Sequence, residues 1–283
     1  MSESAKVKPF LKWAGGKQGL VPHLIHLFPA KFGTYYEPFL GGGSVFFSLQ
    51  PGKAVVSDSN RWLIDTYLAL RDDWKEVAMH LDEFENTKES FLQVRKLDPQ
   101  EFPLHRRAAM LIFLNKTCFR GLFRVNKRGQ FNVPYGEYDR RYYSPENLHD
   151  VSLALNKIDI RSGDFELGVS GVQSGDFVYL DPPYHMQEGH SGFNRYTSTQ
   201  YRDNDQVRLT AFCHELDDMG VQWALSNSNT DFVRKLFTGY QFTEMTCRRE
   251  INLVSKARTT VELLITNYKP KPSIQDELML FSA

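Results

Sequence analysis

Short apolar runs alternate along the chain with longer stretches in which apolar residues recur at helical spacing. Such alternation is typical of α/β proteins, in which each helix returns the chain to a parallel sheet and covers one of its faces. The pattern predicts helices over 204–219 and 230–237. It predicts parallel strands at 34–38, 54–57, 157–161, 176–181 and 221–226. We therefore expect an α/β fold built on a doubly wound sheet.

Two regions depart from this alternation. Residues 240–248 and 260–268 are apolar runs joined by a polar segment, which predicts an antiparallel pair on one edge of the sheet. Between the second and third strands the pattern becomes helical, with amphipathic runs at 61–84 and 104–114. The expected organisation is a discontinuous sheet domain (1–60 and 147–270), an inserted helical domain (61–146) and a loosely ordered tail (271–283).

The tetrapeptide Asp181-Pro182-Pro183-Tyr184 follows the apolar run 177–180. It should therefore lie at the carboxyl end of a buried strand, where open α/β sheets bind their ligands. The carboxylate and the Pro182 carbonyl can accept both hydrogens of an amino group on an aromatic ring, because the prolines fix the direction of that carbonyl. The tyrosine offers a face for stacking a base taken out of its helix. A proline-rich turn that only closes a strand is the alternative, so neighbouring motifs must decide.

A glycine-rich turn at residues 40–44 joins the first predicted strand to the start of a helix. Glycines let a ligand approach the backbone, and a helix N-terminus offers N–H donors. Asp58, at the end of the second strand, suits a ribose diol. The turn does not read G-x-G-x-x-G, which disfavours a nicotinamide cofactor, and Gln18 after Lys17 excludes a phosphate loop. An ordinary strand–helix turn is the alternative.

Composition and charge add less. The 283 residues suffice for one substantial core and a smaller lobe. Lys and Arg number 34, as do Asp and Glu, so the overall charge carries no nucleic-acid signature. Within residues 116–141, however, seven basic residues face two acidic ones and alternate with aromatic rings. This stretch suits phosphate contact and base reading, with a solvated charged surface as the alternative.

Other classes of site find no support. The three cysteines and eight histidines lack the spacing of a disulfide framework or a zinc site, so we expect no metal. No signal peptide or membrane-length apolar run is found, which predicts a cytoplasmic protein without membrane contact.

Several motifs together resemble those of Dam-type (D12 class, alpha group) DNA adenine-N6 methyltransferases. They are Phe-Leu-Lys-Trp-Ala-Gly-Gly-Lys at 10–17, Glu-Pro-Phe-Leu-Gly-Gly-Gly at 37–43, the segment 120–136 and Asp-Pro-Pro-Tyr at 181–184. Further similarity is found at 163–165 and 261–268. The order is that of the family, with cofactor motif, recognition insert and catalytic motif in turn, and the likeness covers most of the chain.

The resemblance implies a Rossmann-like S-adenosylmethionine-dependent methyltransferase sheet with an inserted, mainly helical target recognition domain. Lys17 would lie near the cofactor carboxylate, Asp58 would bind its ribose, and Asp164 its adenine. The implied catalytic residues, which hold the target adenine during in-line transfer, are Asp181, Pro182, Pro183 and Tyr184. The implied cofactor contacts are Trp13, Lys17, Glu37, Pro38, Phe39, Gly41, Gly43, Asp58, Asp164, Phe165 and Asp181. The implied DNA contacts are Lys12, Arg120, Leu122, Arg124, Asn126, Lys127, Asn132, Pro134, Tyr135 and Tyr196.

The expected activity is methylation of adenine N6 in duplex DNA after base flipping, without a metal. Leu122 and Arg124 match family members that read GATC, whereas Arg120 stands where many relatives carry asparagine, so a related short motif is the alternative. We expect a monomer that acts on double-stranded DNA, either solitary or with a cognate restriction endonuclease acting separately. The other readings are a methyltransferase for cytosine, RNA or a protein amide, and a DNA-binding relative without catalysis.

Overall fold

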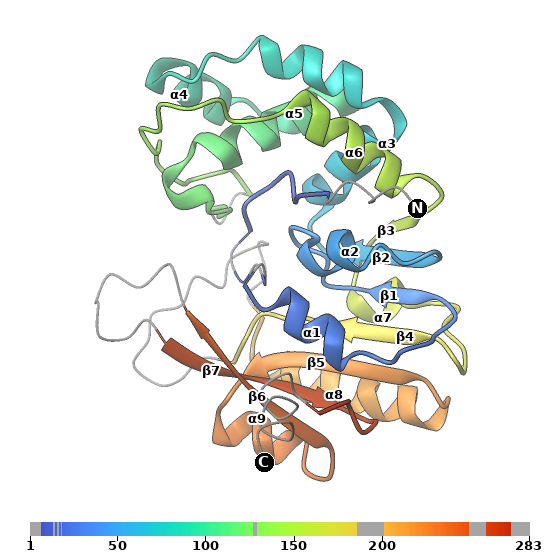
Figure 1. Cartoon of the computed structure of the whole chain (residues 1–283). Helices are drawn as coiled ribbons and strands as arrows, with labels where there is room; N and C mark the ends of the chain where they lie inside the picture. The colour runs from blue at the N-terminus through green and yellow to red at the C-terminus, as the bar shows by residue number, and fades with distance from the viewer. Residues whose placement is uncertain are drawn as a thin grey trace, which may run out of the picture.

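The computed structural model describes residues 7–13, 15, 17, 19–126, 129–185, 201–248 and 259–272. Its strands are β1 (Tyr35–Glu37), β2 (Ala54–Asp58), β3 (Asp159–Ser162), β4 (Phe177–Leu180), β5 (Gln222–Ser228), β6 (Gln241–Arg248) and β7 (Thr259–Thr266). Within the described residues they form one seven-stranded sheet, in the order β3-β2-β1-β4-β5-β7-β6 (Figure 1).

The sheet is parallel from β3 to β5, and β7 runs antiparallel to both β5 and β6. The predicted strands and the predicted antiparallel edge pair are confirmed, each bound lying within two residues of the expected one. Because the central strands are parallel, the carboxyl ends of β1, β2 and β4 meet at one edge of the sheet. Every residue of β1 and β4 is buried, as expected for strands with helices on both faces.

The helices cover both faces of the sheet and form a separate lobe. They are α1 (Val21–Leu27), α2 (Ser44–Leu49), α3 (Arg61–Asp82), α4 (Lys88–Lys96), α5 (Leu104–Thr117), α6 (Pro145–Leu155), α7 (Phe165–Gly168), α8 (Asp203–Asp218) and α9 (Asp231–Leu236). The predicted helices at 61–84, 104–114, 204–219 and 230–237 are confirmed as α3, α5, α8 and α9. Among the described helices, none is long and apolar enough to cross a membrane.

Alternate residues of each strand point to opposite faces, and this divides the core in two. Phe177 and Tyr179 of β4 join the cluster that contains α1, α2 and the helices between β2 and β3. Val178 and Leu180 join the second cluster, with α7, α8 and α9. The fold is thus a three-layer α/β/α arrangement, consistent with the Rossmann-like fold expected.

The helical lobe comprises α3, α4, α5 and α6 and stands beside the β3 edge of the sheet (Figure 1). Helix α3 packs against both α5 and α6. Every residue from 108 to 115 in α5 is buried, which makes α5 the central helix of the lobe. Asp65 of α3 is also buried and accepts hydrogen bonds from Arg61 (2.7 Å) and from Arg107 of α5 (2.9 Å).

The turn between β1 and α2 requires glycine. Gly41 and Gly43 adopt φ angles of +50° and +68°, a left-handed conformation that side chains disfavour. A Cβ on Gly41 would lie 2.7 Å from a ring carbon of Trp13, and one on Gly43 would lie 2.9 Å from the Tyr67 hydroxyl. That hydroxyl donates a hydrogen bond to the Gly41 carbonyl (2.9 Å), so α3 holds the turn in place.

The Asp65 ion pairs yield a stability prediction. Replacing Asp65 with alanine leaves Arg107 without its buried carboxylate, which should lower the free energy of unfolding by about 3–5 kcal/mol. Urea denaturation measures this loss. Asp72→Ala is the matched control, because Asp72 pairs with Arg71 in a partly exposed position, where such a pair contributes about 0–1 kcal/mol. Equal losses in the two variants would contradict the structural role of Asp65.

The glycine turn yields a second prediction. Gly43→Ala forces a side chain into the left-handed region against Tyr67 and should lower the free energy of unfolding by about 1–3 kcal/mol. Gly52→Ala is the control, because no atom lies within 4 Å of the Cβ position there. Urea denaturation of both variants checks the difference, and a Gly43 variant as stable as the control would show that the turn tolerates a side chain.

Candidate active site

Asp181 immediately follows β4, at the carboxyl edge of the sheet. Its Oδ1 accepts a hydrogen bond from the Lys17 ammonium at 2.9 Å, and the same ammonium donates to the Gly15 carbonyl at 3.1 Å. Burial raises the pKa of Asp181, although the charge of Lys17 opposes that rise. Pro182 is buried, and the Lys17 nitrogen also lies over the Tyr184 ring, 4.5 Å from the ring centroid.

Glu262 of β7 completes this cluster, although the sequence did not single it out as a site residue. Its Oε2 accepts a hydrogen bond from the Tyr184 hydroxyl at 2.8 Å and lies 3.9 Å from the Lys17 nitrogen. Glu262 is buried. The signal that could have found it is one carboxylate inside the apolar run 261–265, since buried charges in strands need a partner.

A second buried network fixes the loop after Asp181. The Gln206 side chain of α8 donates to the Pro183 carbonyl (3.0 Å) and accepts from the Asn227 amide (3.0 Å). Asn227 in turn accepts from the backbone N–H of His185 (3.3 Å), whose carbonyl accepts from the Ser228 hydroxyl (2.7 Å). Three buried polar side chains of α8 and β5 thus hold the backbone on both sides of Tyr184, at Pro183 and His185.

The predicted cofactor residues gather at the same edge. Glu37, which ends β1, is buried and accepts a hydrogen bond from the Tyr35 hydroxyl (2.8 Å). Asp58, which ends β2, accepts from the backbone N–H groups of Gly41 (2.9 Å) and Asn60 (2.8 Å). Burial raises the pKa of Asp58, and these backbone donors oppose the rise. The carboxylate therefore ties the glycine turn to the second strand.

An aromatic pair follows β1 and β3. Phe39, which follows the buried Pro38, stacks on Phe165 with 5.4 Å between ring centroids and 27° between ring planes. The guanidinium of Arg208 lies 4.4 Å from the Phe165 centroid and donates to the Asp164 carboxylate at 2.5 Å. Arg208 was not predicted, because α8 is distant in sequence. Its ion pair means that Asp164 already has a charged partner.

The N-terminal segment links this edge of the sheet to the helical lobe. Trp13 stacks on Phe123, with ring centroids 5.1 Å apart and planes at 20°. The buried side chain of Asn115 makes two hydrogen bonds to the backbone of Lys12. The Lys12 N–H donates to Asn115 Oδ1 (2.9 Å), and the Lys12 carbonyl accepts from Asn115 Nδ2 (2.8 Å). Trp13, a predicted cofactor residue, thus stacks on Phe123, which lies among the predicted DNA contacts.

Residues 118–136, here called the recognition segment, carry most of those contacts. Arg124 is half-buried, and its guanidinium donates to the side-chain and backbone oxygens of Asn132, at 2.7 and 3.0 Å. Two hydrogen bonds thus fix the plane of the guanidinium against Asn132. Leu122 is buried, with 7% of its surface exposed, so it packs beneath the segment and does not present its side chain on the surface.

Other predicted contacts differ in exposure. Tyr135 is half-buried and donates its hydroxyl hydrogen to the Asn86 carbonyl (2.9 Å). Asn126 bonds to the Gln130 side chain (3.0 Å), which closes a turn within the recognition segment, and Pro134 is exposed. Two predicted contacts lie outside the described residues, Lys127 and Tyr196.

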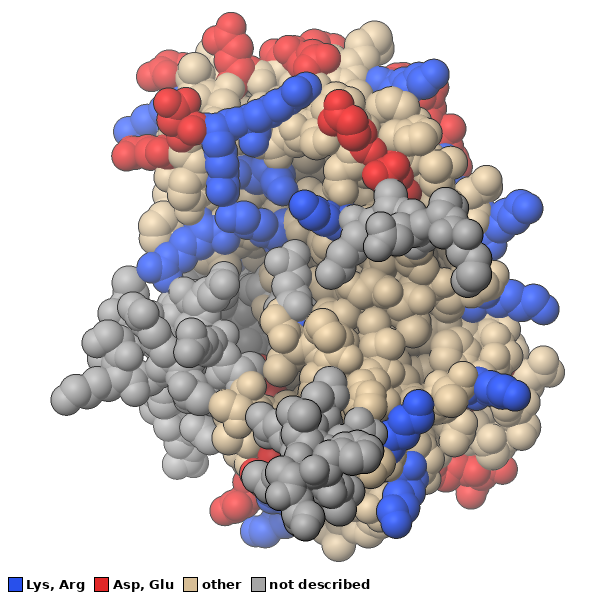
Figure 2. Space-filling view, viewed as in Figure 1, with Lys and Arg blue, Asp and Glu red and all other residues tan. Residues whose placement is uncertain are grey.

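Basic side chains gather on the side of the helical lobe that faces the sheet (Figure 2). Arg120 adopts a φ of +59°, and its backbone N–H donates to the Tyr138 hydroxyl (2.9 Å). Lys12 and Arg140 both approach the ring of Tyr138, at 5.6 and 4.8 Å. Burial lowers the pKa of Lys116, and the charges of Lys12 and Arg140 lower it further. A cluster of like charges of this kind attracts anions.

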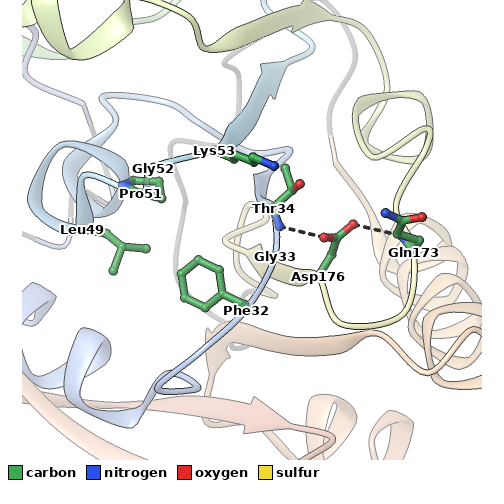
Figure 3. A pocket seen from close by; sticks show the side chains of 9 residues that line it. All are labelled: Phe32, Gly33, Thr34, Leu49, Pro51, Gly52, Lys53, Gln173 and Asp176. Atoms are coloured by element: carbon green, nitrogen blue, oxygen red, sulfur yellow. Dashed lines mark hydrogen bonds between the residues drawn. The ribbon is translucent and has the colours of Figure 1, made fainter.

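A separate hollow lies at the opposite end of the sheet, where β1 and β4 begin. Figure 3 shows Phe32, Lys53 and Asp176 among its lining residues. The Asp176 carboxylate accepts from the backbone N–H groups of Thr34 (2.7 Å) and Gln173 (3.0 Å). These bonds join the loop before β1 to the loop before β4. The predicted catalytic residues lie at the carboxyl ends of the strands, away from this hollow.

Comparisons with known proteins agree with this geometry. Residues 13–251 match the model of the D12 class N6 adenine-specific DNA methyltransferases. The chain is 40% identical to the type II methyltransferase M.MjaIII of Methanocaldococcus jannaschii, over 93% of this chain and 100% of that protein. It is 38% identical to the type II methyltransferase M1.LlaDCHI of Lactococcus lactis subsp. cremoris, over 93% and 96%. It is 31% identical to the DNA adenine methylase of Serratia marcescens, over 93% and 99%. The chain belongs to the family of D12 class N6 adenine-specific DNA methyltransferases.

Proposed function

We propose that this methyltransferase transfers the methyl group of S-adenosylmethionine to N6 of an adenine flipped out of duplex DNA, within GATC or a related short motif. The observation that carries this proposal is the half-buried carboxylate of Asp181, which pairs with the same Lys17 ammonium that lies over the Tyr184 ring. A carboxylate accepts hydrogen bonds from an amino group, and an aromatic ring stacks on a base. Both groups stand at the carboxyl edge of the sheet, where such folds bind ligands.

The target amino group would be held from two sides. One N–H would donate to Asp181 and the other to the carbonyl of Pro182, while Tyr184 stacks on the ring. Since both acceptors pull on the amino hydrogens, the nitrogen lone pair is less delocalised into the base and better placed to attack a methyl carbon. Pro182 and Pro183 fix the backbone, and Gln206 holds the Pro183 carbonyl through a hydrogen bond.

The residues at the ends of β1 and β2 fit S-adenosylmethionine, which supplies an electrophilic methyl group when bound. The absence of a side chain at Gly41 lets the Trp13 ring, a proposed cofactor contact, lie directly against this turn. Asp58 accepts from the backbone of Gly41, Ser59 and Asn60, and a carboxylate has about four acceptor sites, so it can also accept from a ribose hydroxyl. The resemblance implied that Lys17 contacts the cofactor carboxylate. We propose instead that Lys17 acts at the target-base site, because its ammonium pairs with Asp181.

Residues 61–146 are proposed as the target recognition domain. Lys12, Arg120, Arg124, Asn126 and Asn132, with Pro134 and Tyr135, would face the DNA, and the basic cluster around Tyr138 would neutralise phosphates. A monomer suffices to read a short duplex motif one strand at a time. Two of the relatives are type II methyltransferases, which supports a role beside a separate restriction endonuclease. A DNA substrate supports a cytoplasmic location.

An assay with purified protein tests the reaction and the motif together. The chain is incubated with labelled S-adenosylmethionine and short duplexes that contain GATC or a single changed base pair, and the nucleosides are separated. We expect N6-methyladenine from the GATC duplex, and strong 2-aminopurine fluorescence when that base replaces the target adenine. N4-methylcytosine, or label in RNA or protein but not in DNA, would overturn the proposal.

Burial of Glu37 predicts a pH-dependent stability. Burial raises the pKa of Glu37 from 4.5 to about 8. Between these values the folded protein keeps a proton that the unfolded chain releases, so the free energy of unfolding should fall as the pH rises through this window. Glu37→Gln removes the titrating group. Urea denaturation without cofactor should therefore show the variant gaining stability relative to the parent from about pH 5 to about pH 8. A difference that does not vary with pH would contradict this pKa.

Arg124 is predicted to read one base pair. Its guanidinium is positioned by Asn132, and arginine is the side chain that most often reads a guanine edge, through two hydrogen bonds. Arg124→Ala should relax discrimination by about 1–3 kcal/mol at a single position of the motif, measured as the ratio of kcat/KM for matched and substituted duplexes. A uniform loss across all duplexes would instead make Arg124 a phosphate contact.

A further inference from the structure

The Lys17 ammonium contacts both Asp181 and the face of the Tyr184 ring. Its nitrogen is 2.9 Å from the Asp181 carboxylate and 4.5 Å from the ring centroid, and Lys17 itself is buried. It donates a further hydrogen bond to the Gly15 carbonyl at 3.1 Å. In this state a nitrogen of the chain itself makes the two contacts, to a carboxylate and to an aromatic face, that the proposed function gives to the target base.

A target adenine and the ammonium cannot share this space. A base that donates its amino hydrogen to Asp181 while stacking on Tyr184 lies against the ring face that Lys17 covers. Lys17 must therefore move before the base is bound. A buried ammonium cannot be left without a partner, because the cost of an unpaired buried charge exceeds that of most single interactions.

Glu262 is placed to receive it. Its Oε2 lies 3.9 Å from the Lys17 nitrogen, so a small displacement brings the ammonium into hydrogen-bonding distance. The carboxylate is fixed by β7, where Glu262 pairs with Ser228 of β5 and Met245 of β6. The same oxygen accepts from the Tyr184 hydroxyl at 2.8 Å, so Glu262 touches both the group that must move and the ring that must stay.

We propose that Glu262 is a positioning residue that receives the Lys17 ammonium when the target amino group binds Asp181, so that Lys17 exchanges one carboxylate for the other as the base enters. This inference rests on the proposed function, because it assigns Asp181 to the target amino group. In this proposal β7 takes part in the reaction, because it carries the second carboxylate. Without that carboxylate, Lys17 would stay at Asp181 and block the target base.

A simpler role for Glu262 would be to orient Tyr184 by accepting a hydrogen bond from its hydroxyl. Substitutions can separate this role from that of receiving the Lys17 ammonium. Glu262→Gln keeps an oxygen that accepts from Tyr184 but loses the charge that attracts an ammonium. Lys17→Met removes the ammonium while keeping an apolar side chain of similar length. Glu244→Gln is the control for loss of a carboxylate from the neighbouring strand β6, because Glu244 is exposed and pairs with Arg234.

The experiment uses the full chain and a duplex with adenine at the target position and 2-aminopurine as the neighbouring base, because 2-aminopurine itself has no amino group at C6 to bind Asp181. Base entry is read from 2-aminopurine fluorescence and single-turnover transfer from N6-methyladenine, with thermal midpoints and S-adenosylmethionine affinity measured alongside. We expect Glu262→Gln to reduce base entry and transfer by about tenfold, within the range of coupling between contacting residues. Cofactor affinity and thermal midpoint should stay near those of the parent and of Glu244→Gln.

The decisive comparison repeats the substitution in the Lys17→Met background. There we expect Glu262→Gln to change base entry by less than about twofold, because no ammonium has to be received. Equal losses with and without Lys17 would overturn the proposal and leave Glu262 as a support for Tyr184. Parent-like base entry in the Glu262→Gln single variant would also overturn it. Failure of the parent chain itself to make N6-methyladenine would instead refute the proposed function.

Discussion

The ion pair between Lys17 and Asp181 joins the parts of this molecule that are far apart in the sequence. A carboxylate at the end of a buried strand needs a charged partner, because an unpaired charge there would be strongly destabilising. The partner comes from the N-terminal segment, which α5 holds through Asn115 and the recognition segment holds through the stack of Trp13 on Phe123. Sheet, helical lobe and recognition segment therefore meet at one charged contact.

The parallel sheet makes this meeting possible. Because β1, β2 and β4 run in the same direction, Glu37, Asp58 and Asp181 all emerge at one edge, although more than a hundred residues separate the second from the third. Because burial raises the pKa of Glu37 to about 8, the negative charge at this edge comes from the other two carboxylates, and it favours cationic partners. One is the ammonium of Lys17, and a sulfonium cofactor is another that suits the same field. A site that binds a cation and an amino group side by side is what methyl transfer to adenine requires.

Much of the fold and the core of the candidate site could be predicted from the sequence. Buried parallel strands are apolar runs, and the glycine turn and the residues 181–184 are local motifs whose geometry follows from their own side chains. Glu262 leaves only a weak local signal, a carboxylate within an apolar run. Gln206, Asn227 and Arg208 could not be found in this way, because each acts through a partner from a distant element. Helix α4 and the strand order were missed for a related reason: short amphipathic runs and strand pairing are decided by packing, which local pattern does not encode. The burial of Leu122 likewise depends on how the recognition segment folds back on the lobe.

The most direct test of methyl transfer at Asp181 is modification-sensitive sequencing of DNA from a methylation-free host that expresses the chain or its Asp181→Ala variant. The geometry predicts N6-methyladenine in one short motif with the parent chain and none with the variant. Unmodified adenine from a parent chain that folds and binds S-adenosylmethionine, or equal methylation by the variant, would contradict the assignment of Asp181 to the target amino group.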